Sequence, residues 1–371
     1  MTAAAVHAVL VLGGYGNFGA SICRALAKDE NIRLLIAGRD AGKAKHFASQ
    51  IELPDDRGMQ LDADVAGMSR QLQALGVDTL IHAAGPFQGR DYRVAQACIE
   101  AGCNYIDLAD ARDFVAGIAE LDDAARAAGV LVTSGASSLP ALSAAVVDNF
   151  LPEFSRLDTI SHGIVAGART PGLATLRAVL GYCGQPFRRL EDDRWETVYG
   201  WQDLHRRRYP APIRGRWLAS CNVPDLVLFP RRYAEVSSVT FHAGLGIPLS
   251  NLVIWALSWL ARWGLVDNLA GWAKPLYWIS RKLEAVGTRN SAMHVELSGI
   301  GRNGQPLTRT WHLLAFDHHG SNVPCGAAIA LARKLTRGEL LPSGAMPCLG
   351  LLTLEEYMEA LAGLNIRQIL S

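Results

Sequence analysis

A glycine-rich segment near the start of the sequence constrains the fold of this chain more than any other feature. An apolar run at residues 8–12 leads into the segment Gly13-Gly14-Tyr15-Gly16-Asn17-Phe18-Gly19, and a helical pattern follows as far as Lys28. The spacing GxGxxG between a strand and a helix is typical of a loop that binds the pyrophosphate of a dinucleotide. Gly14 permits the turn out of the strand, Gly16 removes the Cβ that would block the phosphates, and Gly19 allows close packing of the helix. We therefore expect a dinucleotide-binding domain with this segment as its phosphate loop.

Strand and helix patterns alternate through the first third of the chain. Parallel strands need crossover connections, and helices supply them, so this alternation predicts an α/β fold with a doubly wound (Rossmann) parallel sheet of six strands. The expected strands are residues 8–12, 32–37, 58–61, 78–83, 104–108 and 130–133, and the expected helices are residues 17–28, 41–50, 65–75, 91–101 and 112–127.

The pattern changes after residue 147, where β-like segments are mixed with helices. The turn Arg302-Asn303-Gly304-Gln305 between two of these segments predicts a β-hairpin. We expect a second, α+β domain over residues 141–321, which is built on an antiparallel sheet and serves substrate binding and dimerisation. An alanine-rich helix from Pro324 to Arg337 is expected to return to the first domain, which then comprises residues 1–140 and 322–371. The β-like segments are residues 158–165, 236–243, 292–300 and 308–316.

Length and composition exclude several classes of protein. A chain of 371 residues is long enough for two domains, and its net charge of +1 gives no reason to expect nucleic acid as a partner. Seven cysteines occur without a CxxC pair, so we expect neither a disulfide framework nor a metal site. The first residues lack the basic start of a signal peptide, which makes the cytoplasm the expected compartment.

The end of the second expected strand bears on the choice between NAD and NADP. An acidic residue about twenty positions after the glycines is typical of NAD enzymes, because it binds the ribose hydroxyls. Here the strand ends in Gly38-Arg39-Asp40. Gly38 leaves room for a 2′-phosphate that Arg39 can bind, with Lys43 one helical turn further on. We therefore expect NADP, with NAD as the less favoured cofactor; Asp40 either binds the ribose or caps the following helix.

Further positions at strand ends are expected to touch the cofactor. Asp62 follows the third strand, where side chains approach the adenine, unless it or Asp64 caps the next helix. The turn Ala84-Gly85-Pro86-Phe87 follows the fourth strand beside the switch point of the sheet, where small residues allow backbone contact with the nicotinamide half; a plain turn is the alternative. Ser137 follows the sixth strand, and it either binds the cofactor or caps a helix.

Residues of the fifth strand and its carboxyl end are the candidates for catalysis. Asp107 and Asp110 come where a proton donor for hydride transfer belongs. Tyr105 alternates with Asp107, so both side chains point to the same face of the sheet. The alternatives are structural: one aspartate caps the helix that begins near Arg112, and Tyr105 is a core aromatic residue.

Taken together, these motifs resemble the saccharopine dehydrogenase family. The resemblance implies a cofactor domain interrupted by a substrate domain, and pyridine-nucleotide redox chemistry such as the reduction of an imine. Other members of the family act on different molecules, including enoyl groups of lipid chains. In this family a loop like residues 166–172 faces the cofactor cleft, which makes Arg169 and Thr170 candidates for substrate binding; a simple helix start is the alternative. The resemblance rests on the glycine loop and on residues 37–39, 84–87, 105–110, 135–140 and 324–338.

One segment, residues 243–261, contains no charged residue and raises the question of membrane contact. Glycine and proline interrupt its first part, and Trp255, Trp259 and Trp263 then recur on one helical face. Four interpretations remain open: the wall of an apolar substrate pocket, a dimer interface, a peripheral membrane contact through residues 249–263, and a transmembrane helix.

The sequence as a whole predicts an NADP-dependent oxidoreductase that forms a homodimer. It is expected to transfer hydride to or from a C=N, C=C or C=O bond of a small-molecule, partly hydrophobic substrate. The alternative is a non-catalytic protein that binds or senses NADP(H), for example at a membrane surface.

Overall fold

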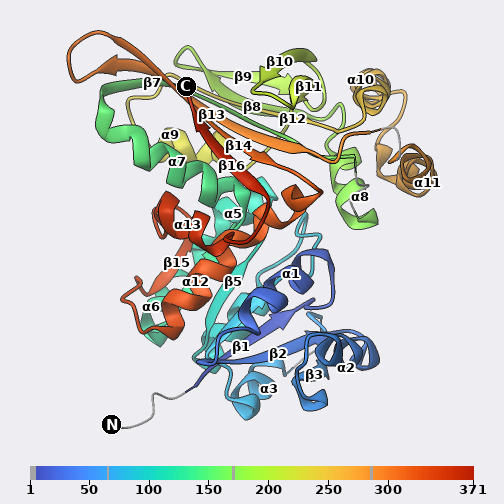
Figure 1. Ribbon diagram of the computed structural model, residues 1–371, viewed down its shortest axis with the longest axis vertical. Helices are drawn as coiled ribbons and strands as arrows, with labels where there is room; N and C mark the ends of the chain where they lie inside the picture. The colour runs from blue at the N-terminus through green and yellow to red at the C-terminus, as the bar shows by residue number, and fades with distance from the viewer. Residues whose placement is uncertain (1–5, 65–66, 169–171, 285–286) are drawn as a thin grey trace. The chain divides into compact units, whose positions relative to one another are not determined.

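The computed structural model describes residues 6–64, 67–168, 172–284 and 287–371. The chain divides into two compact units, each built from two stretches of sequence (Figure 1). The first unit comprises Met1–Ala145 and Asn322–Ala362, and the second comprises Val146–Ser321 and Gly363–Ser371.

The first unit is built on a seven-stranded sheet in the order β15-β6-β5-β4-β1-β2-β3, in which every pairing is parallel. Its interior strand β1, between β4 and β2, is buried over Ala8–Leu12, as expected of a strand covered on both faces. The predicted doubly wound fold is thereby confirmed. The strands are β1 (His7–Leu12), β2 (Ile32–Gly38), β3 (Gly58–Gln60), β4 (Thr79–His82), β5 (Asn104–Asp107), β6 (Leu131–Ser134) and β15 (Gly344–Pro347).

The helices of the first unit follow the expected positions with two local differences. The expected helix at 65–75 begins only at Met68, after Gly67 in a left-handed conformation (φ +82°), and residues 65–66 lie outside the described part. The expected helix at 112–127 consists of two short helices joined by a 3-10 turn, Ile118–Leu121. The helices are α1 (Asn17–Leu26), α2 (Ala41–Gln50), α3 (Met68–Leu75), α4 (Arg93–Ala101), α5 (Arg112–Gly117), α6 (Asp122–Ala128), α12 (Gly326–Thr336) and α13 (Leu354–Ala360).

The carboxyl-terminal part of the chain completes the first unit. The expected tail helix is present as α12, in which residues 326–332 are all buried. It packs on α1, and the Arg333 guanidinium donates to the carbonyl oxygen of Ala25 at 3.3 Å. Strand β15 then pairs in parallel with β6 as a seventh strand that the sequence pattern did not indicate. The last nine residues were expected in the first domain but belong to the second unit, because β16 (Ile366–Leu370) pairs with a strand of that unit.

The second unit contains a seven-stranded sheet in the order β10-β11-β12-β7-β13-β14-β16 and a separate hairpin, β8-β9. The four expected β-segments form β7, β12, β13 and β14, and the expected hairpin turn joins β13 to β14. The sheet is mixed, because β12 and β7 pair in parallel and the other neighbours are antiparallel. The strands are β7 (Phe154–Val165), β8 (Pro186–Glu191), β9 (Arg194–Tyr199), β10 (His205–Tyr209), β11 (Arg214–Ser220), β12 (Ser238–Gly244), β13 (Ser291–Gly301) and β14 (Pro306–Ala315).

Three helices of the second unit share a small apolar core. Leu176, Leu180, Ile254 and Ala273 are buried together in it, with Trp201 from the loop after β9. Among the described residues, no helix is long and apolar enough to span a membrane. The helices of this unit are α7 (Ser143–Phe150), which begins in the first unit, α8 (Leu173–Gly181), α9 (Asp225–Arg232), α10 (Pro248–Arg262) and α11 (Ala273–Leu283).

Candidate dinucleotide site

The glycine loop between β1 and α1 has the geometry of a phosphate site. Gly13 adopts a left-handed conformation (φ +83°), and a Cβ on Gly19 would overlap the carbonyl oxygen of Gly13. A Cβ on Gly16 would meet only that same oxygen, at 3.1 Å, so the outer side of Gly16 is open. No side chain caps α1, which leaves the N–H groups of its first turn available to an anion. Gly16 and Asn17 are exposed, and the Phe18 side chain is half-buried.

Tyr15 occupies the space that the sequence analysis assigned to a phosphate group beside Gly38. A Cβ on Gly38 would lie 2.6 Å from the Tyr15 hydroxyl oxygen, so this position requires glycine because the tyrosine ring lies across it. The Asp40 N–H donates to the same hydroxyl at 3.1 Å. The expectation that Gly38 leaves room for a ligand is therefore wrong, since Tyr15 fills that room.

At the end of β2, Asp40 and Lys43 interact with each other, whereas among the described residues the Arg39 side chain makes no such contact. The Asp40 carboxylate accepts a hydrogen bond from the Lys43 N–H at 3.0 Å and caps α2, which decides between the two roles considered for it. It also lies 3.7 Å from the Lys43 ammonium in an exposed pair, and its pKa is lowered chiefly by the hydrogen bond from the Lys43 N–H. Arg39 is exposed and, within the described parts of the chain, makes no hydrogen bond or ion pair.

The segment after β3 does not cap a helix. The half-buried Asp62 accepts from the Asp64 N–H at 3.2 Å, and Asp64 pairs with Arg90 at 3.0 Å and Arg93 at 3.4 Å. The capping position of α3 is Gly67 instead. Asp62 therefore follows the carboxyl end of β3 and does not cap a helix, which was the alternative to contact with the cofactor.

The turn after β4 lies against the glycine loop. A Cβ on Gly13 would lie 3.0 Å from both the N and the Cβ of Ala84, so the two turns touch where the strand order reverses between β1 and β4. Ala84, Gly85 and Pro86 are exposed. The Phe87 ring is buried, at 4.9 Å from the His82 ring and 5.3 Å from Phe114 between ring centroids. Its side chain is thus part of the core and does not face a ligand.

Asp107 is fully buried at the end of β5. Its Oδ1 accepts hydrogen bonds from the N–H groups of Ala109 and Gly135 and from the Ser134 hydroxyl, each at 2.9 Å. Burial raises the pKa of this carboxyl to about 6, against the opposing effect of these hydrogen bonds. These contacts join the ends of β5 and β6, so the expectation that Asp107 touches substrate is not supported by its position.

Tyr105 belongs to the same buried group. Its hydroxyl lies 3.1 Å from Nδ1 of His82, which the sequence analysis did not single out. Burial raises the pKa of Tyr105 well above its ordinary value and lowers the pKa of His82 to about 4. His82 and Asp107 are paired residues in the register of β4 and β5, and Tyr105 lies two residues before Asp107 on the same face of β5. The alternation of side chains along the two strands could therefore have indicated that His82 and Tyr105 lie together. Tyr105 is the core residue that the alternative interpretation described.

Asp110 and Ser137 remain at the surface of this edge. Asp110 is exposed, accepts from the Gln88 amide at 3.1 Å and does not cap α5, whose capping position is Ala111. Ser137 is half-buried, and its side chain makes no capping hydrogen bond. The substrate candidates Arg169 and Thr170 lie outside the described residues.

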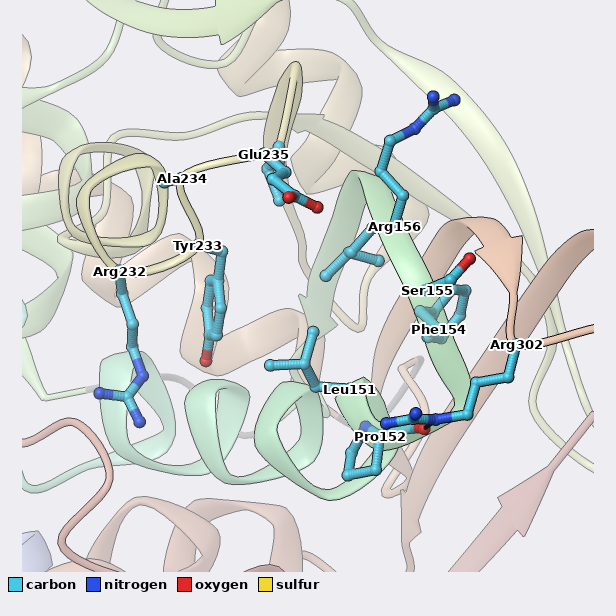
Figure 2. Close-up of a pocket in the computed structure, with 12 residues that line it drawn as sticks. Leu151, Pro152, Phe154, Ser155, Arg156, Arg232, Tyr233, Ala234, Glu235 and Arg302 are labelled. Carbon is cyan, nitrogen blue, oxygen red and sulfur yellow. Dashed lines mark hydrogen bonds between the residues drawn. The ribbon is translucent and has the colours of Figure 1, made fainter. Parts of the chain in front are cut away.

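A cavity of about 430 Å³ lies in the second unit and has a different character (Figure 2). Two of its arginines are engaged, because Arg232 pairs with Asp148 at 2.7 Å and Arg156 pairs with Asp158 at 2.6 Å. The Tyr233 hydroxyl donates to Asp148 at 2.8 Å. The two arginines and the tyrosine are engaged in these contacts, and Glu235 adds a carboxylate to the lining of the cavity.

Known proteins resemble this chain in the sequence of its first unit and in its fold. Residues 9–133 match the family model of the saccharopine dehydrogenase NADP binding domain. In fold, the chain is similar to saccharopine dehydrogenase (L-Glu forming) from Saccharomyces cerevisiae, with 13% identity, coverage of 98% of this chain and 100% of that chain, and a TM-score of 0.71. It is also similar to an amine dehydrogenase from Mycobacterium smegmatis, with 11% identity, 95% coverage of each chain and a TM-score of 0.49. No curated protein gives a significant sequence match.

The glycine loop, the parallel sheet and the matched NADP binding domain define an NAD(P)-dependent oxidoreductase. The resemblance inferred from the motifs is confirmed for residues 9–133, which match the NADP binding domain of saccharopine dehydrogenase.

Proposed function

We propose that the chain uses NADP in preference to NAD and transfers hydride to or from a C=N, C=C or C=O bond of a small, partly hydrophobic molecule. The observation that carries the cofactor choice is the contrast at the end of β2. Asp40, which would bind the ribose hydroxyls of NAD, is engaged as the cap of α2, whereas the neighbouring Arg39 is exposed and unpaired within the described residues. An arginine so placed suits a 2′-phosphate, because its planar guanidinium can donate two parallel hydrogen bonds.

The remaining residues of the edge fit the other parts of this cofactor. The open side of Gly16 and the uncapped start of α1 suit the pyrophosphate, and the half-buried Asp62 suits the adenosine side. The exposed backbone at Ala84–Pro86 and the uncommitted Ser137 hydroxyl suit the nicotinamide side. NADP, when it is bound, supplies or accepts the hydride. The protein then has to hold the substrate, exclude water and move a proton.

Asp110 is the best candidate to handle that proton. Among the three residues that the sequence singled out for catalysis, only Asp110 exposes its side chain, while Asp107 and Tyr105 are buried. The hydrogen bond from Gln88 orients its carboxyl group at the end of β5. We therefore assign Asp110, rather than Asp107, the contact with substrate.

The substitution Arg39→Ala tests the cofactor choice. A lost charge-assisted contact of about 1.5–3 kcal/mol should weaken NADPH binding by about 10- to 150-fold and leave NADH binding unchanged. Titration by nicotinamide fluorescence measures both dissociation constants. The exposed Lys45→Ala on α2 is the control and should leave both unchanged. Equal loss for the two cofactors, or no loss for NADPH, would contradict the role of Arg39.

A non-catalytic NADP(H)-binding protein is the competing function. The burial of Asp107 and Tyr105 favours it, because these side chains cannot reach a substrate. Incubation with NADPH and a panel of imines, enoyl thioesters and ketones separates the two functions. Oxidation of NADPH with any member of the panel supports the oxidoreductase, and tight NADPH binding without turnover on every member supports the binding protein.

A further inference from the structure

Helices α10 and α11 and the segment between them carry most of the exposed apolar side chains of the second unit. Of the thirteen large apolar side chains that are exposed among the described residues, eight lie between positions 249 and 279. Leu265, Trp263 and Trp278 are exposed to 68%, 65% and 62%. Scattered exposed apolar residues are ordinary, but a group of this size marks an interaction surface. The other members of this group, which we call the α10–α11 surface, are Leu249, Leu252, Val253, Trp272 and Ile279.

Helix α10 carries apolar side chains on its exposed side as well as on its buried side. Its buried positions are Asn251, Ile254 and Ser258, of which Ile254 lies in the small core, while its exposed positions include Leu249, Leu252 and Val253. An amphipathic helix at the surface of a globular protein normally turns its apolar residues toward the core. The outward apolar face of α10 is therefore directed at something other than the core of its own unit.

Helix α11 adds positive charge to the same region. Its exposed positions combine Trp278 and Ile279 with Lys274, Arg281 and Lys282. The Arg281 guanidinium lies 5.7 Å from the centroid of the Trp278 ring. Both helices pack on one small core, and their labels lie near each other at one end of the second unit (Figure 1). From position 248 to 283 the sequence has four basic residues against one acidic residue, whereas the whole chain is nearly neutral.

We propose that the α10–α11 surface docks on an anionic lipid bilayer, with α10 lying in the interfacial plane. Exposed tryptophan and leucine beside lysine and arginine are typical of helices that lie at the boundary of headgroups and acyl chains. The charge of the surface complements an anionic membrane. It opposes a two-fold contact between two copies, because the same positive charges would face each other.

The structure argues against one of the other interpretations of the segment, because none of the described helices is long and apolar enough to span a bilayer. A docked membrane would bury the exposed apolar side chains without a membrane-spanning helix. A second copy of the chain remains as the competing occupant, and the experiment must distinguish it.

Sedimentation of the full chain with lipid vesicles tests the proposal. Binding should be strong on vesicles that contain phosphatidylglycerol and weak on vesicles of phosphatidylcholine alone. The triple variant Leu252→Ser, Trp263→Ser and Trp278→Ser should lose about tenfold or more of this binding. Trp195→Ser, which removes an exposed tryptophan from β9, is the matched control and should bind as the wild type does. NADPH affinity and circular dichroism confirm that each variant is folded.

The charges are tested by a second set of variants. Lys274→Gln, Arg281→Gln and Lys282→Gln should each weaken binding to anionic vesicles by about fivefold. The same number of charges removed from β9 and β10, as Arg194→Gln, Arg206→Gln and Arg208→Gln, should have a much smaller effect. Equal loss in the two sets would show attraction by net charge alone and would overturn the proposal.

Two further outcomes would also overturn it. Vesicle binding that is unchanged in the apolar triple variant would mean that another surface binds lipid. Absence of vesicle binding, together with a dimer in sedimentation equilibrium that the same triple variant dissociates, would assign the surface to a second copy. Quenching of tryptophan fluorescence by brominated phospholipids in the wild type, reduced in the triple variant, would support insertion of the surface into the bilayer.

Discussion

At the scale of single residues, Asp107 shows how a strand-end carboxylate can serve the fold rather than the reaction. Its position at the end of β5 suggests catalysis, because ligands of parallel α/β sheets bind at the carboxyl ends of the strands. Three donors from β6 and from its own loop instead hold this carboxylate inside the unit. Sequence position alone could not separate Asp107 from the exposed Asp110, because burial depends on how two loops fold over the strand end.

The raised pKa of Asp107 predicts a pH-dependent contribution to stability. An ordinary aspartate titrates near 3.8, and Asp107 titrates at about 6, so the folded state binds a proton more tightly between these values. Its contribution to the free energy of unfolding therefore falls as the pH rises from 4 to 6, by an amount on the order of 3 kcal/mol. Asp107→Asn is neutral throughout and keeps an oxygen for the same donors, so the variant should gain stability relative to the wild type over this range.

Thermal unfolding of both proteins at a series of pH values checks this expectation. His82 has a lowered pKa and the opposite dependence, with stability rising between pH 4 and 6.5, but it is present in both proteins and cancels in the difference. The exposed Asp123→Asn is the control and should show no such trend. A constant difference between Asp107→Asn and the wild type from pH 4 to 7 would refute the buried titration.

At the scale of elements, the sequence predicted those strands and helices whose burial follows a simple periodicity. The strands β1 and β2 are apolar runs because both faces of a parallel sheet are covered, and that pattern is visible without a structure. Strand β15 has only four residues and includes a proline, so neither its existence nor its pairing with β6 could be read from the sequence. The hairpin β8-β9 is mostly exposed and charged, and it has no apolar alternation to detect.

Helix α10 was indicated by its sequence, but its orientation was not. Periodicity identifies an apolar face without stating what covers that face. The orientation depends on Asn251, whose side chain accepts from the Leu245 N–H and donates to the carbonyl oxygens of Leu245 and Ile247, at 2.9, 2.9 and 3.1 Å. These three hydrogen bonds tie α10 to the turn before it and place a polar residue on the buried side.

Asn251→Ala should therefore destabilise the second unit more than a surface substitution does. Loss of these three hydrogen bonds, one buried and two partly buried, leaves backbone groups without partners and should cost about 2–3 kcal/mol in the free energy of unfolding. Ser258→Ala is the matched control, because Ser258 is equally buried but bonds only to the Trp255 carbonyl of its own helix, and it should cost less than about 1 kcal/mol. Urea unfolding followed by tryptophan fluorescence measures both values. Equal costs would mean that Asn251 does not fix the position of α10.

At the scale of the whole molecule, the chain leaves its cofactor unit and later returns to it. A window of the sequence shows local pattern, and it cannot show that residues 322–362 pack on the first 145. The buried face of α12 was the available signal, since an alanine-rich helix of this kind needs a partner. The fold of each unit followed from local patterns, whereas the point of return depended on long-range packing and on a resemblance to known proteins.

This discontinuity predicts which fragments of the chain fold. Residues 6–145 alone lack β15 and α12, so they would expose β6 and the face of α1 that α12 covers. We expect this fragment to be aggregated or unfolded. The same residues joined to 322–362 by a flexible linker of about a dozen residues should fold cooperatively and bind NADPH, because the linked chain restores the complete sheet. Circular dichroism during urea unfolding and NADPH fluorescence compare the two chains. Cooperative unfolding and NADPH binding by residues 6–145 alone would show that the returning segment is an accessory to the dinucleotide unit and not a part of its core.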